Sequence, residues 1–229
     1  MKHITKGNPP QSLGPAVHAV KISPGNQNVC DIYSLLDSAT KQDILEACVR
    51  EQQGLCAYTG LQLKNRSGAF EAHVEHLIPR SVSCPKYNSY PSDPQETVSW
   101  SNLVACYPSN PGGMEFGAGK KDDWPSNSDK HLLLSPLHSA CEAGIKYREN
   151  GKADGLTAAG EETVKRLNLN HSYLKQARKD LIEQAIQLCK TSRHKRLLIK
   201  SLEDPNANEL PEFAYQRCQV LRRKWAGLV

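Results

Sequence analysis

Two short segments, His73 to Arg80 and Ser101 to Cys106, constrain the fold of this chain more than any other part of it. The first has the pattern of a short strand with apolar flanks, and the polar loop beyond it favours a strand end there. Glu75 and His76 are neighbours, so in a regular strand their side chains point to opposite faces. They converge on one site only at a strand end or a bulge. The second segment carries Asn102, which is placed to fix the connecting loop.

These residue types suit the hydrolysis of a phosphodiester. The reaction needs a base that deprotonates water, and positive charge that neutralises the phosphoryl and leaving oxygens. Mg²⁺, or Mn²⁺ in its place, supplies such charge and prefers one or two carboxylates together with the phosphate of the substrate. We predict that Glu75 binds the metal, that His76 is the general base, and that Asn102 spans the loop and orients the His76 backbone. Asn110 is the best candidate for a further metal ligand, with the acidic pair at 122–123 behind it.

Each of these residues also has a plain structural interpretation. His76 can be a buried strand histidine that bonds to a backbone carbonyl, and Glu75 can be a surface ion-pair partner of Arg80. Asn102 can form a simple Asx turn. The run Lys-Lys-Asp-Asp at 120–123 is as typical of a solvated turn as of a phosphate contact. With that alternative open, the candidate contacts to nucleic acid are Arg80, Lys120 and Lys121.

Length and composition set broad limits. A chain of 229 residues can bury a sizeable core without a cofactor or disulfide. The formal net charge of +5 permits a polyanionic partner without proving one. The longest apolar run is too short to cross a bilayer, and no apolar core follows the basic start of the chain, so a soluble, cytoplasmic protein is expected. The eight cysteines form no Cys-x-x-Cys pair and are expected to be thiols.

The hydrophobic pattern changes along the chain. Residues 1–29 are rich in Pro, Gly, Asn and Gln, which predicts an extended arm with one short strand at most, at Ala16 to Ile22. Apolar residues at helical spacing then predict one or two helices, with Ser38 or Thr40 as the cap and Gly54 as the stop.

Beyond residue 54, a hairpin is expected around the turn Thr59-Gly60, and a strand at Ala72 to Ile78. The last third is expected to be helical. Thr157 should cap a helix that runs through Leu167. Two further helices are predicted at His171 to Cys189 and at Leu210 to Leu228.

Several motifs follow one another in a fixed order over most of the chain. They are Met1-Lys2-x-Ile4-x-Lys6, Glu51-Gln52-x-Gly54-Leu55-Cys56-Ala57-Tyr58, His73-Val74-Glu75-His76, Asn102-Leu103-x-x-Cys106, Gly117-x-x-Lys120-x-Asp122, Cys141-Glu142 and Leu167-Asn168-Leu169-Asn170. In this order they resemble the HNH (ββα-metal) nucleases, and within them the PtuB-like subunits of Septu and retron-linked anti-phage defence systems. The resemblance implies an HNH endonuclease that works beside a PtuA-like ATPase, whose state controls when nucleic acid is cut.

The resemblance also implies a fold and its division. We expect an α+β protein in which an HNH ββα-metal core is flanked by N- and C-terminal helices. The N-terminal arm and helices should span residues 1–54, the core residues 55–135 and the C-terminal helical region residues 136–229. DNA is the expected substrate and tRNA the alternative. The competing hypothesis is a catalytically decayed binding or scaffold subunit of the same complex.

The sequence departs from the family at the zinc knuckle that usually braces this fold. Two cysteine pairs are expected, but Cys56 is followed by Thr59, and Cys106 is followed by Ser109, where second cysteines would fall. Two thiolates cannot close a tetrahedral site alone. Structural zinc is therefore not expected, and the alternative is a degenerate site completed by His73 or Cys84.

Overall fold

The computed structural model describes residues 1–25, 29–84 and 93–227. Its α-helices are α1 (Leu13–Ile22), α2 (Ser38–Glu51), α3 (Arg80–Ser83), α4 (Ala118–Lys121), α5 (Cys141–Gly144), α6 (Ala158–Arg166), α7 (Ser172–Leu188), α8 (Ser192–Leu202) and α9 (Ala214–Lys224). Short 3-10 helices are η1 (Tyr33–Leu35), η2 (Pro94–Val98), η3 (Trp100–Asn102) and η4 (Asn127–Leu132). The strands are β1 (Asn65–Arg66), β2 (Ala69–Phe70), β3 (His73–His76), β4 (Leu103–Cys106), β5 (Ile145–Tyr147) and β6 (Ala153–Gly155).

The strands form three small antiparallel pairs, β1 with β2, β3 with β4 and β5 with β6. Helices and small antiparallel sheets in one chain make the fold α+β, which confirms the expected class at this level. In the central pair, Glu75 lies opposite Val104 and His76 lies opposite Leu103. All four residues of β4 are buried, so β3 is held against the core by an entirely buried strand.

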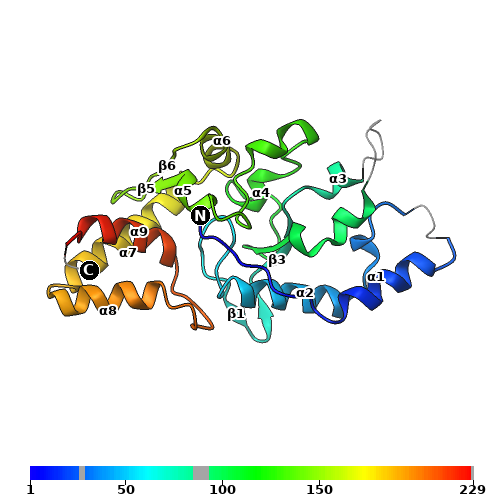
Figure 1. The fold of residues 1–229 in the computed structure, drawn as a ribbon, viewed down its shortest axis with the longest axis horizontal. Helices are drawn as coiled ribbons and strands as arrows, with labels where there is room; N and C mark the ends of the chain where they lie inside the picture. Colours follow the sequence, from blue (N-terminus) through cyan, green and yellow to red (C-terminus); the bar gives the residue numbers. More distant parts are fainter. Residues whose placement is uncertain (26–28, 85–92, 228–229) are drawn as a thin grey trace.

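Figure 1 shows how the elements are distributed in space. Helices α7, α8 and α9 lie together at one end of the molecule, and α1, α2 and α3 lie at the other. The N-terminal arm crosses the region between them (Figure 1), where the Ile4 N–H donates to the Pro136 carbonyl at 2.8 Å. The arm therefore connects segments that are far apart in the sequence.

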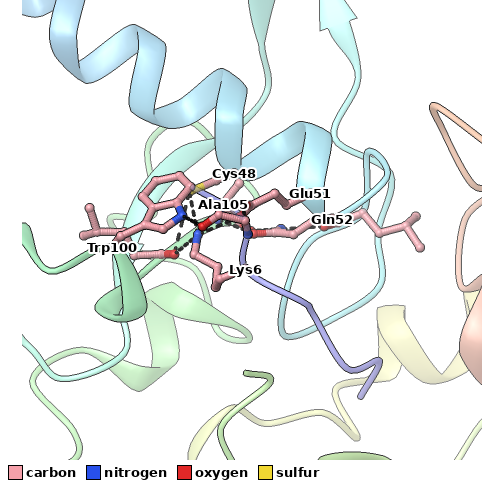
Figure 2. Close-up of polar contacts among 9 residues, drawn as sticks. Lys6, Cys48, Glu51, Gln52, Trp100 and Ala105 are labelled. Carbon is pink, nitrogen blue, oxygen red and sulfur yellow. Dashed lines mark hydrogen bonds and ion pairs between the residues drawn. The ribbon is translucent and has the colours of Figure 1, made fainter. Parts of the chain in front are cut away.

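Helix α2 is joined to β4 by the side chain of Gln52, which is the residue that follows the helix (Figure 2). Gln52 Oε1 accepts from the Ala105 N–H at 2.7 Å, and Gln52 Nε2 donates to the Ala105 carbonyl at 2.8 Å. The same nitrogen donates to the Leu55 carbonyl at 2.7 Å, and the Ala57 N–H also donates to Ala105. Alternate residues of a strand direct their main-chain groups to the same side. We infer that Gln52 occupies the edge of β4 opposite β3, where a third strand would otherwise pair.

Lys6 fixes the next position along that edge. Its Nζ donates to the Leu103 carbonyl at 3.0 Å, forms an ion pair with Glu51 at 2.9 Å and lies 3.3 Å from the centroid of the Trp100 ring (Figure 2). A cation in contact with both a carboxylate and an aromatic face is well compensated on burial. The N-terminal arm is thereby attached to α2 and to β4 at one point.

Several predicted elements are confirmed. Helix α2 is present, and the chain turns away after it at Gly54, where φ is +73°. The predicted cap was wrong, because Asp37, and not Ser38 or Thr40, caps the helix by accepting from the Thr40 N–H. Thr157 caps α6 by accepting from the Gly160 N–H. Helix α7 lies within the predicted range. Leu55 bridges Gln62 across the predicted turn, although the pairing is too short to form a named strand.

Other expectations were wrong. Residues 16–22 belong to helix α1 and not to a strand, because Pro15 lies in the first turn, where its missing N–H costs nothing. The last helix is confined to Ala214–Lys224, and its predicted end, Leu228, lies outside the described residues. The β5–β6 hairpin was not predicted, and helix α8 lies in the last third, which was expected to be helical, but its bounds were not predicted. Within the part of the chain that the structure covers, no helix is both long and apolar enough to cross a bilayer.

The contacts of Gln52 lead to a stability prediction. Replacing Gln52 with Leu leaves the buried Ala105 N–H without a partner, and we expect the free energy of unfolding to fall by about 2–4 kcal/mol. Gln42→Leu on the exposed face of α2 is the matched control, with an expected change of less than about 0.5 kcal/mol. Urea unfolding of the three proteins measures the difference. Equal stability of the two variants would show that the Gln52 contacts do not hold β4.

Candidate active site

A cavity of about 640 Å³ with many titratable side chains lies beside β3. Both Glu75 and His76 line it, although they are neighbours on a strand. The cavity includes the end of β3 and the turn beyond Pro79, so both faces of the strand end contribute to its wall. Its charged or titratable lining residues are Asp31, His73, Glu75, His76, Arg80, Lys121, Asp122 and Asp123.

Glu75 lies between Lys121 and His73. Its Oε1 lies 2.8 Å from Lys121 Nζ, and its Oε2 lies 3.6 Å from His73 Nε2. His73 shares a face of β3 with Glu75, as the two-residue spacing requires. Lys121 is only 3% exposed and also donates to the His76 carbonyl at 3.0 Å. Lys121, one of the two lysines predicted to contact nucleic acid, is therefore a buried ion-pair partner and does not lie in a solvated turn.

The pKa values of this pair follow from the contacts. Burial alone would raise the pKa of Glu75, but His73 and the Lys121 ammonium outweigh it and lower that pKa. Burial alone would lower the pKa of His73, but the Glu75 carboxylate and the Pro108 carbonyl outweigh it and raise that pKa. Glu75 is accordingly a carboxylate at neutral pH, and its charge is balanced within the protein.

His76 has a different environment. It is 6% exposed, its Nε2 lies 2.9 Å from the Thr97 carbonyl oxygen, and its ring meets that of Tyr33 edge-on with centroids 4.7 Å apart. Burial lowers the pKa of His76 to about 4. The imidazole is therefore neutral at physiological pH, as a base must be.

Asn102 spans the loop between β3 and β4. The Ile78 N–H donates to Asn102 Oδ1 at 2.7 Å, and Asn102 Nδ2 donates to the carbonyls of Ile78 at 3.1 Å and Glu96 at 2.9 Å. The Leu77 N–H donates to the Asn102 main-chain carbonyl at 2.9 Å. Three of these four bonds hold the two residues after His76, so the contact reaches the backbone beyond His76 and not His76 itself.

The rim of the cavity is formed by residues from distant segments. Arg80 pairs with Asp31 at 2.9 Å and not with Glu75, so the predicted alternative of a Glu75–Arg80 pair was wrong. A disulfide joins Cys30 to Cys84, with Cα atoms 5.2 Å apart, and it holds Asp31 beside the cavity. The expectation that all eight cysteines are thiols was therefore wrong for these two.

The donor groups do not fit a divalent metal in this arrangement. Both oxygens of Glu75 face a cation or a histidine, and Asn110 is exposed, with its Oδ1 accepting from the Gly112 N–H. Asn110 does not line the cavity, although its neighbour Pro111 does. No group of three or more His, Cys, Asp or Glu residues is placed to hold a metal within residues 1–25, 29–84 and 93–227. The Mg²⁺ or Mn²⁺ assignment stays a prediction.

Cys56 and Cys106 are both buried. Burial alone would raise the pKa of Cys56, but hydrogen bonds from Cys106, Thr59 and the Tyr107 N–H outweigh it and lower that pKa. Burial and the neighbouring Cys56 raise the pKa of Cys106. One thiol thus donates to the other, and the pair is satisfied by hydrogen bonding.

The structure brings together Glu75, His76, Arg80 and Lys121, and it leaves Asn110 and the exposed Lys120 outside the cavity. Sequence reasoning missed Asp31, because it lies 44 residues before Glu75 in the numbering and nothing local marks it. Its proximity to Cys30 was the available signal, but scattered cysteines do not reveal their pairing.

Comparison with known proteins does not assign a family. No family model matches the chain, and no curated protein matches it. The interpretation of the site therefore depends on the geometry around β3 and on the residues quoted above.

The buried His76 makes stability depend on pH. The unfolded chain protonates this residue below about 6.5, but the folded chain does so only below about 4. Between these values the unfolded state binds more protons, so stability falls as the pH falls through the window. We expect His76 to lower the free energy of unfolding by about 2 kcal/mol from roughly pH 7 to pH 5.

Urea unfolding at both pH values tests this dependence. His76→Gln should remove that part of the difference, whereas His131→Gln at an exposed position should retain it. An unchanged pH dependence in His76→Gln would mean that the pKa of His76 is the same in the folded and the unfolded chain.

Proposed function

We propose that this protein is an HNH-type endonuclease that hydrolyses phosphodiesters of nucleic acid, with His76 as the general base. The observation that carries the proposal is the state of His76, a neutral imidazole with one nitrogen already bonded, on the wall of a cavity that also contains Glu75 and Arg80. A neutral imidazole on a cavity wall is able to take a proton from water. Its burial and its bond to the Thr97 carbonyl are also those of the structural alternative, a buried strand histidine bonded to a backbone carbonyl.

The tautomer of His76 supports this role. A carbonyl oxygen only accepts, so the bond to Thr97 requires hydrogen on Nε2, and Nδ1 then carries the lone pair. Second bonds of this kind fix the orientation of catalytic histidines. Asn102 contributes by fixing the backbone at Ile78, directly after the strand that carries His76.

The proposed reaction uses groups of the chain. Water transfers a proton to His76 Nδ1 while its oxygen attacks phosphorus, and the bond from phosphorus to the leaving oxygen breaks. The leaving oxygen takes a proton from solvent, and His76 later releases its own proton to solvent, so the balance is one water per bond cleaved. Arg80 lies on the rim and is placed to bind a phosphate oxygen in exchange for Asp31.

The finer fold and partner assignments belong to the same proposal. Strands β3 and β4 followed by the short helix α4 would be the ββα element, and α4 carries Lys121 to the site. On the resemblance of its motifs, the chain would act as the effector of an ATPase-controlled anti-phage defence system, beside a PtuA-like partner. DNA is the first substrate to test and tRNA the second.

A decayed binding or scaffold subunit is the second candidate function. The observation in its favour is that Glu75 is already neutralised by Lys121 and His73, while Asn110 lies outside the cavity. Such a subunit would bind nucleic acid or the ATPase without turnover, and changes at His76 would alter no rate.

Cleavage assays distinguish the two functions. Purified protein, alone and with its ATPase partner, would be incubated with DNA and with tRNA while Mg²⁺, Mn²⁺ and ATP are varied. His76→Ala should lower the cleavage rate by at least about 100-fold, because general-base catalysis contributes that much or more. His131→Ala, at an exposed position, should cleave at the wild-type rate. Circular dichroism confirms that the variants are folded, and full activity in His76→Ala would contradict the nuclease.

The pH profile gives a second test. Because the pKa of His76 is lowered to about 4, its imidazole is unprotonated and active well below the range of an ordinary histidine. The acid limb of kcat/KM should therefore fall near pH 4 to 5 and not near 6.5. Initial rates in buffers of constant ionic strength provide the profile. An acid limb at the ordinary histidine pKa would show that another group, or a solvated His76, is the base.

A further inference from the structure

The ammonium of Lys121 occupies a position suited to a cation. Its Nζ lies 2.8 Å from Glu75 Oε1 and 3.0 Å from the His76 carbonyl oxygen. A carboxylate and a carbonyl are the oxygen donors that hard divalent ions prefer. The same two oxygens therefore face one point, and in this structure Lys121 fills that point.

The burial of Lys121 shows that the contact is not a surface pair. Lys121 is 3% exposed, whereas Lys165, which pairs with Glu162 on α6, has a side chain that is 76% exposed. A buried ammonium needs its compensating groups, because removing it from water is costly. Lys121 has Glu75 and one carbonyl, so two of its three N–H groups are bonded.

We propose that Lys121 and a divalent cation compete for the same place beside Glu75, so that a metal binds only when the ammonium withdraws. The proposal deepens the nuclease function proposed above and rests on it for its biological meaning. Two cations in contact with one carboxylate repel each other strongly in a partly buried site. The wild-type protein should therefore bind a divalent ion weakly at Glu75.

Direct metal binding tests the competition without an activity assay. Mn²⁺ would be titrated into the full-length protein, with free Mn²⁺ followed by electron paramagnetic resonance. Lys121→Met should bind Mn²⁺ at least about tenfold more tightly than the wild type, because a like charge beside the ion is removed. Glu75→Gln in the Lys121→Met background should abolish this gain, which assigns the site. Lys165→Met removes an exposed lysine of a Lys–Glu pair and should leave Mn²⁺ affinity unchanged.

A second neutral variant covers the case in which Lys121→Met does not fold. Lys121→Gln retains a donor for the carboxylate but carries no charge, and it should shift Mn²⁺ affinity in the same direction. Equal affinity of the wild type and the folded neutral variants would overturn the competition. So would a gain that persists after Glu75→Gln. A protein that shows the expected affinities but cuts no nucleic acid would refute the nuclease and leave the competition standing.

Discussion

Strand β4 pairs with β3 along one edge, and side chains bond to the main chain along its other edge. The position of the candidate site depends on these side-chain bonds. A two-stranded antiparallel pair leaves main-chain groups unpaired on its outer edges, and these groups are costly to bury. Gln52 and Lys6 bond to that edge at Ala105 and Leu103. Because β4 is thereby fixed to α2, β3 is fixed too, and Glu75 and His76 are presented from a rigid support.

The two residues at the end of β3 have opposite electrostatic surroundings. Glu75 keeps its charge because Lys121 and His73 lie against it. His76 loses its charge because burial disfavours the imidazolium. Alternation along a strand produces this contrast directly, since adjacent side chains enter different environments. A single dipeptide can therefore supply both a fixed anion and a neutral base to one cavity.

Local signals made part of this architecture predictable from the sequence. The Thr157 cap, the left-handed Gly54 and the Glu75-His76 pair at a strand end depend on neighbouring residues, and each lies where the pattern indicated. Asp31 and the buried state of Lys121 depend on contacts with distant segments, which no local spacing encodes. The helix at residues 13–22 was missed for another reason, because proline and glycine near a helix start resemble those of a loop.

Because a disulfide joins Cys30 to Cys84, two parts of the cavity wall are held in place by different kinds of bond. One part is β3, which pairs with β4 through main-chain hydrogen bonds. Strand β4 is bonded in turn to the side chain of Gln52, the residue after α2. The other part carries Asp31 and is held by the disulfide, which joins two cysteines that are 54 residues apart in the sequence. Reduction of the disulfide would remove this covalent constraint, while the pairing of β3 with β4 would remain. The segment that carries Asp31 and the strand that carries His76 are thus held in place by different kinds of bond.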